Sequence, residues 1–121
     1  MKYDDKNIFA KILRGEIPCK KIYEDEFVLS FYDINPQKKV HALVIPKGKY
    51  TDLDDFSSNA SSEEMVGLLK GINTVAKKLG ISTDTGKGYR ALANISEDGG
   101  QEVPHLHFHL FGGEKIGKMV Q

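Results

Sequence analysis

Seven residues near the C-terminal end alternate between histidine and large apolar side chains, from His105 to Phe111. This period of two is typical of an extended strand, in which successive side chains point to opposite faces. We therefore expect Pro104 to Phe111 to form a strand with His105, His107 and His109 on one face and its apolar residues in the core. Three of the four histidines of the chain lie in this segment, which makes it the first candidate for a functional site.

The remaining sequence predicts two helices and several further strands. We expect helices over Asn7 to Arg14 and from the cap Ser61 to Leu79, and strands over Lys21 to Glu24, Phe27 to Asp33, Val40 to Ile45 and Tyr89 to Ile95. The polar segment from Lys47 to Ser58 is expected to be a loop. Strands followed by one long helix and more strands predict an α+β domain with an antiparallel sheet. At 121 residues, the chain has the length of one domain, 1–121.

Composition and charge exclude several classes of protein. Lysine and arginine total 17, and aspartate and glutamate also total 17, so net charge provides no attraction to nucleic acid or to an anionic membrane. No apolar run approaches the ~20 residues that a membrane span requires. The single cysteine, Cys19, forms no disulfide within the chain, which suits a reducing compartment. We therefore expect a cytoplasmic protein.

The three clustered histidines cannot all be cationic near neutral pH. Alternate residues of a strand lie about 6.5–7 Å apart, and two unit charges at that distance repel by about 2.5 kcal/mol at an effective dielectric constant near 20. This corresponds to nearly two pKa units. At least one imidazole should therefore be neutral, and a neutral imidazole is a competent nucleophile or metal ligand. Two interpretations stay open: a zinc site with three imidazole ligands, and a nucleophilic imidazole with two helpers.

The residues before the histidine segment favour a phosphate as its ligand. Asp98 to Gln101 contains two glycines, and a glycine turn can point backbone N–H groups at an anion. The side chains of Asn94 and Gln101 add neutral hydrogen-bond donors. Neither the Walker motif nor the dinucleotide-binding fingerprint GxGxxG is present. Any nucleotide must therefore be bound in another way.

The segment from His105 to Phe111 resembles the His-φ-His-φ-His-φ-φ signature of the histidine triad family, where φ is an apolar residue. The resemblance extends over nearly the whole chain. Further segments that occur in the same order as in the Hint branch of that family are Asn7 to Phe9, Glu16 to Pro18, Phe31 to Gln37, His41 with Leu43 to Pro46, Gly88 to Arg90, Asn94, and Gly99 to Gln101. The resemblance implies a five-stranded antiparallel meander sheet with one long and one short helix, and a homodimer. A histidine at position 109, where a related transferase branch has glutamine, favours the hydrolases.

The resemblance also implies a mechanism on a purine nucleoside monophosphate that carries a leaving group, often an amine, on its α-phosphate. The middle histidine, His107, would attack phosphorus and form a nucleotidyl-imidazole intermediate, which water then hydrolyses. His109 and the backbone from Gly100 to Glu102 would hold phosphate oxygens. His105 would support the site and help to protonate the leaving amine, and His41 would complete the imidazole network.

By the same resemblance, Asp33 would hold the ribose hydroxyls and Ile34 would contact the nucleoside. The other residues expected to surround the base are apolar: Ile8, Phe9, Ile12, Ile17 and Phe31. Asn94, Gly100, Gln101 and Glu102 complete the expected substrate site. The hydrolytic chemistry of this branch requires no metal and no cofactor.

The chain differs from the best-known members of the family at two places near the expected leaving group. Glu102 stands where many members have serine or threonine, and its charge would favour a cationic leaving group. The chain has no tryptophan, whereas some members have one in the C-terminal tail. We expect a purine nucleoside phosphoramidase or nucleotide hydrolase. The alternatives are a regulatory module that binds nucleotides with incidental hydrolysis, and a zinc enzyme that uses the triad as ligands.

Overall fold

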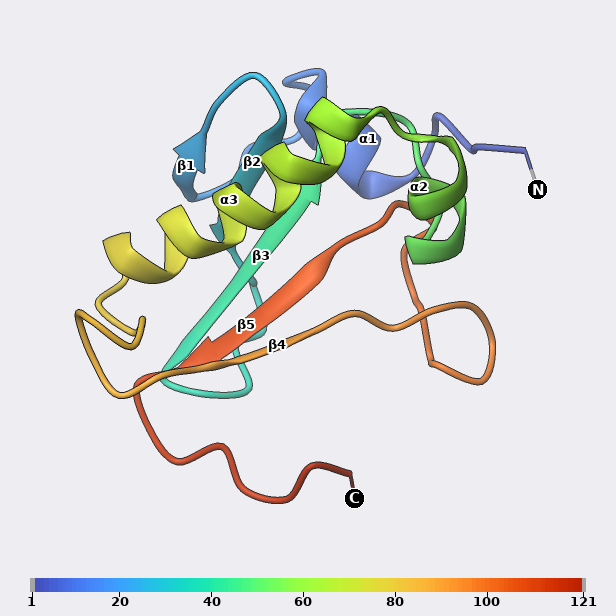
Figure 1. Ribbon diagram of the computed structural model, residues 1–121. Coiled ribbons are helices and arrows are strands. Elements are labelled where there is room, and N and C mark those ends of the chain that lie inside the picture. Colours follow the sequence, from blue (N-terminus) through green and yellow to red (C-terminus); the bar gives the residue numbers. More distant parts are fainter. Residues whose placement is uncertain (1, 121) are drawn as a thin grey trace.

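An antiparallel sheet of five strands organises residues 2–120, the part of the chain that the computed structural model describes (Figure 1). The elements are α1 (Ile8–Leu13), β1 (Lys21–Glu24), β2 (Val28–Tyr32), β3 (Val40–Pro46), α2 (Leu53–Asn59), α3 (Ser62–Lys78), β4 (Arg90–Leu92) and β5 (Phe108–Gly112). The strand order is β1-β2-β3-β5-β4, so β5 lies beside β3 and β4 forms an edge. The expected α+β fold with a five-stranded antiparallel sheet is confirmed, but the sheet is not a simple meander, because β5 lies between β3 and β4. In the described part, no helix combines the length and apolar character needed to cross a bilayer.

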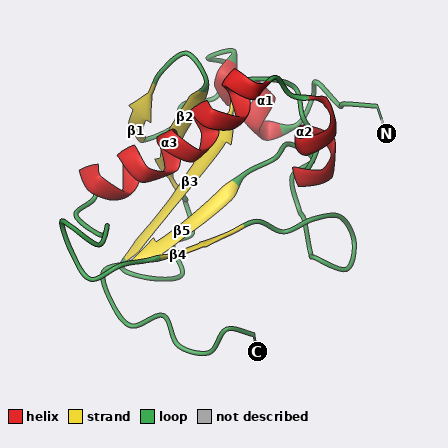
Figure 2. Cartoon of the chain, in the orientation of Figure 1, coloured by secondary structure: helices red, strands yellow, loops and turns green. Residues whose placement is uncertain are grey.

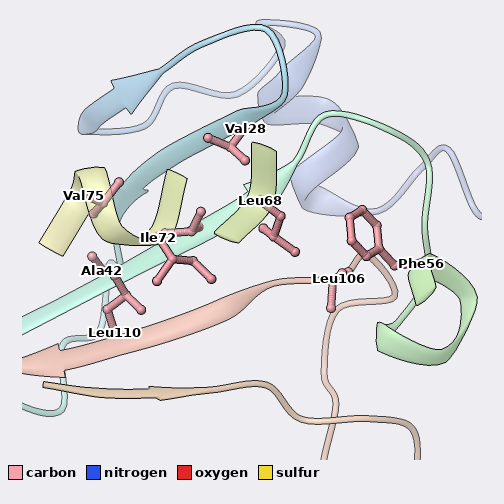
Figure 3. Packing of buried hydrophobic residues seen from close by; sticks show 9 residues of the cluster. Val28, Ala42, Phe56, Leu68, Ile72, Val75, Leu106 and Leu110 are labelled. Carbon is pink, nitrogen blue, oxygen red and sulfur yellow. The ribbon is translucent and has the colours of Figure 1, made fainter. Parts of the chain in front are cut away.

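The long helix α3 covers one face of the sheet. It begins as the sequence predicts, with a capping box in which the Ser61 side chain accepts from the Glu64 N–H and the Glu64 carboxylate accepts from the Ser61 N–H. Its buried side chains pack on aliphatic residues of β2, β3 and β5 (Figure 3). This cluster consists of Val28, Ala42, Val44, Phe56, Leu68, Ile72, Val75, Leu106 and Leu110. Fully burying an aliphatic side chain contributes about 1.5–3 kcal/mol, so this face supplies much of the stability.

The short helix α1 covers part of the opposite face. The Asn7 side chain caps it by accepting from the Ala10 N–H at 2.9 Å, as its position before an apolar run predicts. Phe9 of α1 packs against apolar residues of β2 and β3. These residues alternate along each strand with the residues that face α3, and therefore point to the opposite face of the sheet. This second cluster consists of Phe9, Leu29, Phe31, Leu43 and Ile45.

Three elements differ from the sequence prediction. The segment 47–58, expected to be a loop, contains most of α2. The Asp52 side chain caps this helix by accepting from the Asp55 N–H, and Phe56 buries its ring in the core. β4 is three residues long, shorter than Tyr89 to Ile95. β5 begins only at Phe108, because His105 and His107 lie in irregular chain before it. Figure 2 draws the residues that flank these two short strands as loops.

Candidate active site

The histidines gather on the face of the sheet that α1 partly covers. His107 and His109 have ring centroids 5.1 Å apart, although only His109 belongs to β5. The Phe9 ring meets the rings of both His105 and His107 edge-on, at centroid distances of 6.3 and 4.9 Å. The expected grouping of three imidazoles therefore holds, although the regular strand covers only the last of them.

His107 presents one free ring nitrogen with a lone pair. Its Nδ1 lies 2.7 Å from the carbonyl oxygen of His105. A carbonyl oxygen only accepts, so Nδ1 carries the proton and the neutral ring has its lone pair on Nε2. Burial lowers the pKa of His107 below its usual value of 6.5, which favours the neutral ring at neutral pH. An imidazole in this state is a nucleophile.

His109 differs from His107 at Nε2: this nitrogen carries a free N–H instead of a lone pair. The Gln37 N–H donates to His41 Nδ1 at 3.2 Å, so the neutral ring of His41 has its proton on Nε2. That nitrogen lies 2.9 Å from His109 Nδ1 and donates to it, which leaves the proton of His109 on Nε2. Burial lowers the pKa of His41, against the nearby charge of Asp33. Burial and then repulsion from His107 and His41 lower the pKa of His109 to about 4.

His105 is completely buried and both of its ring nitrogens are occupied. Nε2 donates to the carbonyl oxygen of Pro46 at 2.8 Å, and Nδ1 lies 2.5 Å from the Tyr3 hydroxyl. Burial lowers the pKa of His105 to about 4. The position of His105 fits its expected role in supporting the site. Its engaged ring nitrogens argue against the expected protonation of a leaving amine, which stays a prediction. The one ring proton is held by the carbonyl oxygen of Pro46, so the ring has no free donor.

The glycine turn offers fewer donors than its sequence predicts. The N–H groups of Gly100 and Gln101 donate to the carbonyl oxygens of Glu97 and Ser96. The Gln101 side-chain amide donates to the carbonyl oxygens of Thr51 and Val103, and thus holds the loop together. These groups are thus engaged within the loop, and their expected contact with a phosphate stays a prediction.

Glu102 remains available at the end of this turn. Among residues 2–120, no acceptor is recorded for its N–H, and its side chain is exposed. Its carboxylate lies close enough to His107 to favour the protonated imidazole, against the effect of burial. The Glu102 N–H is thus the candidate anion donor of this loop.

A pocket of about 570 Å³ lies beside His109 on the same face of the sheet. The half-buried Asn94 lines it, and its side-chain amide has no recorded partner within the described residues. The Arg90 guanidinium, which also lines it, donates to the carbonyl oxygens of Gly117 and Lys118 and holds the C-terminal tail at this pocket. Nothing local in the sequence of the tail predicts this contact.

The residues expected to bind the nucleoside divide into two groups. Asp33 lies 3.5 Å from His41 Nε2 and also accepts from the Asn35 N–H at 2.8 Å, which places its carboxylate at the site. Ile34 and Ile8 are 87% and 42% exposed, so they are free to contact a ligand. Phe9 and Phe31 are buried in the cluster under α1, with Ile12 packed against it, while Ile17 is half-buried.

One group of side chains has the composition of a metal site. Asp33, His41 and His109 each offer a ligand atom, and the three atoms lie within 4.8 Å of one another. Two imidazoles and a carboxylate form a known ligand set for zinc. This set differs from the three triad imidazoles expected from the sequence, because both ring nitrogens of His105 are engaged elsewhere.

Comparison with known proteins gives consistent results. A family model described as the HIT domain matches residues 14–116. An uncharacterized 13.2 kDa HIT-like protein of Azospirillum brasilense is 53% identical over 118 residues, covering 98% of this chain and 94% of that protein. A protein of Escherichia coli K12 named purine nucleoside phosphoramidase is 39% identical over 117 residues, covering 96% and 94% of the two chains. The structure of a HIT family hydrolase from Clostridium thermocellum aligns with a TM-score of 0.85 and 38% identity, over 98% of this chain and 99% of that one.

Proposed function

The chain belongs to the HIT domain family, and from this premise we propose that it is a purine nucleoside phosphoramidase of the Hint type. Its substrate is a purine nucleoside monophosphate with an amine on the α-phosphate, and its products are the monophosphate and the free amine. The name of the related Escherichia coli protein supports this substrate class. The similarity to a HIT family hydrolase supports the use of water as the final acceptor.

The hydrogen bond from His107 Nδ1 to the carbonyl oxygen of His105 carries the proposal. It fixes the tautomer that has a lone pair on Nε2, and it remains in place when Nε2 bonds to phosphorus. The imidazolium that then forms keeps its Nδ1 proton on a carbonyl oxygen, which stabilises the positive charge. His107 is therefore assigned as the nucleophile.

In the first step, Nε2 of His107 attacks the α-phosphorus and the bond from phosphorus to the amine breaks. The Nε2–H of His109 and the N–H of Glu102 donate to the phosphoryl oxygens, whose charge increases in the transition state. The amine takes a proton from water in the pocket beside His109 and leaves as a neutral molecule. Because His105 has no free proton, it takes no part in this transfer.

In the second step, water attacks phosphorus and the bond to Nε2 of His107 breaks. The products are the nucleoside monophosphate and one proton from the attacking water. This proton returns to the solvent and balances the proton that the leaving amine took from water in the first step. His107 returns to the neutral ring with its lone pair on Nε2. Splitting one displacement into two is the general advantage of a covalent intermediate.

The nucleoside is placed by the residues beside this imidazole pair. Asp33 accepts hydrogen bonds from the ribose hydroxyls, and the exposed side chains of Ile34 and Ile8 contact the base. Phe9 positions His107 through its edge-on contact rather than by touching the base. No metal or cofactor takes part in these steps.

Replacing the nucleophile tests the proposal. We expect His107→Asn to lower kcat on an adenosine phosphoramidate by at least about 10³-fold, because the covalent path is lost. Calorimetry should show that the variant still binds adenosine monophosphate, and circular dichroism should show an unchanged fold. The matched control is Tyr32→Phe, a change on an exposed residue that should leave kcat as it is.

Activity of His107→Asn within about tenfold of the wild type would contradict the assignment. Nucleotide binding by the wild type with a kcat far below ~1 s⁻¹ on every phosphoramidate would favour a regulatory binding module. Stoichiometric zinc, with activity lost on chelation, would favour metal-dependent chemistry at Asp33, His41 and His109.

We also propose that the protein is a cytoplasmic homodimer. Strand β4 pairs only with β5 in the described chain and leaves its other edge open, and a second copy would cover such an edge. Val66 and Leu69 on α3 are exposed apolar side chains, and a second copy would also bury them. Analytical ultracentrifugation at micromolar concentration should give the mass of two chains, and a monomer mass would contradict the proposal.

A further inference from the structure

Tyr3 lies outside every helix and strand, yet its hydroxyl reaches the first histidine of the triad. The oxygen is 2.5 Å from His105 Nδ1, across 102 positions of sequence. The two rings meet edge-on with centroids 5.6 Å apart. Figure 1 shows the N-terminal segment at the same end of the sheet as the chain that leads into β5. The proposed reaction steps give Tyr3 no role, so this contact needs its own explanation.

The direction of this hydrogen bond follows from the other partner of His105. The carbonyl oxygen of Pro46 only accepts, so the proton of the neutral His105 ring is on Nε2. Nδ1 then has a lone pair, and the Tyr3 hydroxyl must donate to it. Each partner specifies the same tautomer, and the ring is completely buried between them. Without Tyr3, Nδ1 would be a buried acceptor with no donor, a state that folded proteins avoid.

The orientation of His105 matters because the nucleophile depends on it. The carbonyl oxygen of His105 holds the Nδ1 proton of His107 at 2.7 Å, so a shift of the backbone at His105 changes the aim of Nε2. Phe9 touches both rings edge-on, so a turn of the His105 ring also disturbs the packing of His107. A misplacement of this kind acts on the attack step rather than on nucleotide binding.

We propose that Tyr3 is a positioning residue, whose hydroxyl locks the buried His105 in one tautomer and one ring orientation and thereby aims His107 at phosphorus. The kinetic part of this inference rests on the proposed phosphoramidase activity. The tautomer lock itself does not, because it exists in the protein without substrate. Tyr3 touches neither substrate nor the reacting atoms, and it acts only through His105.

The test compares Tyr3→Phe with Tyr32→Phe. Both variants lose one tyrosine hydroxyl, but Tyr32 is exposed and has no recorded side-chain hydrogen bond in the described chain. Tyr3→Phe should lower kcat about tenfold, the scale of one buried hydrogen bond, and leave KM within about twofold. Tyr32→Phe should change neither constant. A purely structural defect would instead reduce the folded fraction, which circular dichroism measures separately.

Nitrogen-15 NMR of the histidine rings reports the lock without any substrate. The wild type should show His105 as the Nε2–H tautomer, with Nδ1 shifted by a strong hydrogen bond. It should also show a slowly exchanging Tyr3 hydroxyl proton with a nuclear Overhauser effect to His105. This second observation needs no variant, so it stands if Tyr3→Phe does not fold. In folded Tyr3→Phe, the His105 signals should move or split.

The tautomer lock is overturned if the Tyr3 hydroxyl exchanges rapidly or if the His105 signals are the same in both variants. Where the wild type hydrolyses a phosphoramidate, the positioning role is overturned if Tyr3→Phe and Tyr32→Phe have equal kcat. If no protein hydrolyses a phosphoramidate while the His105 signals still depend on Tyr3, the proposed function fails and the lock stands. If hydrolysis occurs and the nitrogen-15 signals of His105 do not depend on Tyr3, the proposed function stands and the lock fails.

Discussion

On the face of the sheet beneath α3, Val28, Val44 and Leu110 are completely buried and belong to one hydrophobic cluster. On the face beneath α1, His41 and His107 are almost as deeply buried, but specific hydrogen-bond partners hold their rings. An aliphatic side chain needs neighbours of the right shape, whereas a buried imidazole also needs donors and acceptors in the right directions. The face under α3 therefore supplies much of the free energy of folding. The face under α1 is less stabilising, because burying neutral imidazoles in fixed tautomers costs part of that free energy.

Adjacent residues of β5 give the sharpest test of this division, because His109 and Leu110 point to opposite faces. Leu110→Ala should lower the free energy of unfolding by about 2–5 kcal/mol and leave kcat/KM of the folded protein nearly unchanged. His109→Ala should lower kcat/KM about 10²-fold, the scale of one lost transition-state donor, with a smaller effect on stability. Urea unfolding and steady-state kinetics on both variants measure the two effects. Equal losses of activity in the two variants would break the comparison.

The two faces should also respond differently to acid. His105 has an ordinary pKa near 6.5 when unfolded and about 4 when folded, so between these values the unfolded state binds more protons. Stability should therefore fall as the pH decreases, by on the order of 2 kcal/mol from His105 alone between pH 7 and pH 5. Urea unfolding at several pH values measures this slope.

Leu110→Ala is the control for the acid response, because it removes no titrating group. It should lower stability by the same amount at each pH and keep the slope of the wild type. A wild-type stability that does not change between pH 7 and pH 5 would contradict the neutral, buried state of the imidazoles.

Close packing under α3 predicts a smaller effect at Gly67. A Cβ at this position would lie 2.5–2.7 Å from three atoms of Phe27, including the base of its ring. Gly67→Ala should therefore lower the free energy of unfolding by about 1–2 kcal/mol, although alanine favours a helix more than glycine does. The control is Lys70→Ala, a change at an exposed position of α3, which should stay within about 0.5 kcal/mol. Thermal unfolding of the two variants decides whether this face is packed as tightly as the distances indicate.

The helix cap predicts the smallest effect. Ser61→Ala removes the side-chain oxygen that accepts from the Glu64 N–H and should cost about 1 kcal/mol of stability. Ser62→Ala, one residue later, removes a hydroxyl with no recorded partner in residues 2–120 and should cost less than about 0.5 kcal/mol. Both variants should keep full activity, because α3 lies on the face opposite the histidines. Loss of activity in either would show that the two faces are coupled.

Local sequence signals predicted most of the fold. Alternating apolar residues identified β2 and β3, and the capping residues Asn7 and Ser61 placed the starts of α1 and α3. The prediction failed at α2, whose seven residues contain one buried anchor, Phe56, among polar side chains. α1 is shorter still, but four of its six residues are large and apolar, whereas α2 has only Leu53 and Phe56 among polar residues and thus no apolar repeat to detect. Packing of Phe56 against the core stabilises α2.

The candidate site was predicted less completely, and the reason is the range of its contacts. The alternation of histidines identified the triad, but the role of each ring depends on partners far away in sequence. Pro46 and Tyr3 occupy the nitrogens of His105, and these contacts span 59 and 102 positions. A single sequence contains no signal for such pairs. The sequence therefore does not indicate that the ring nitrogens needed for the expected proton donation by His105 are already engaged.

The span between Tyr3 and His105 also bears on the order of events during synthesis of the chain. The N-terminal residues leave the ribosome first, and their histidine partner follows only after most of the protein has been made. β5, which must insert between β3 and β4, is equally late. A nascent chain that ends before residue 105 thus lacks both β5, the strand that joins β3 to β4, and the partner of Tyr3. Assembly of the imidazole cluster should be among the last events of folding, since contacts of such long range close slowly.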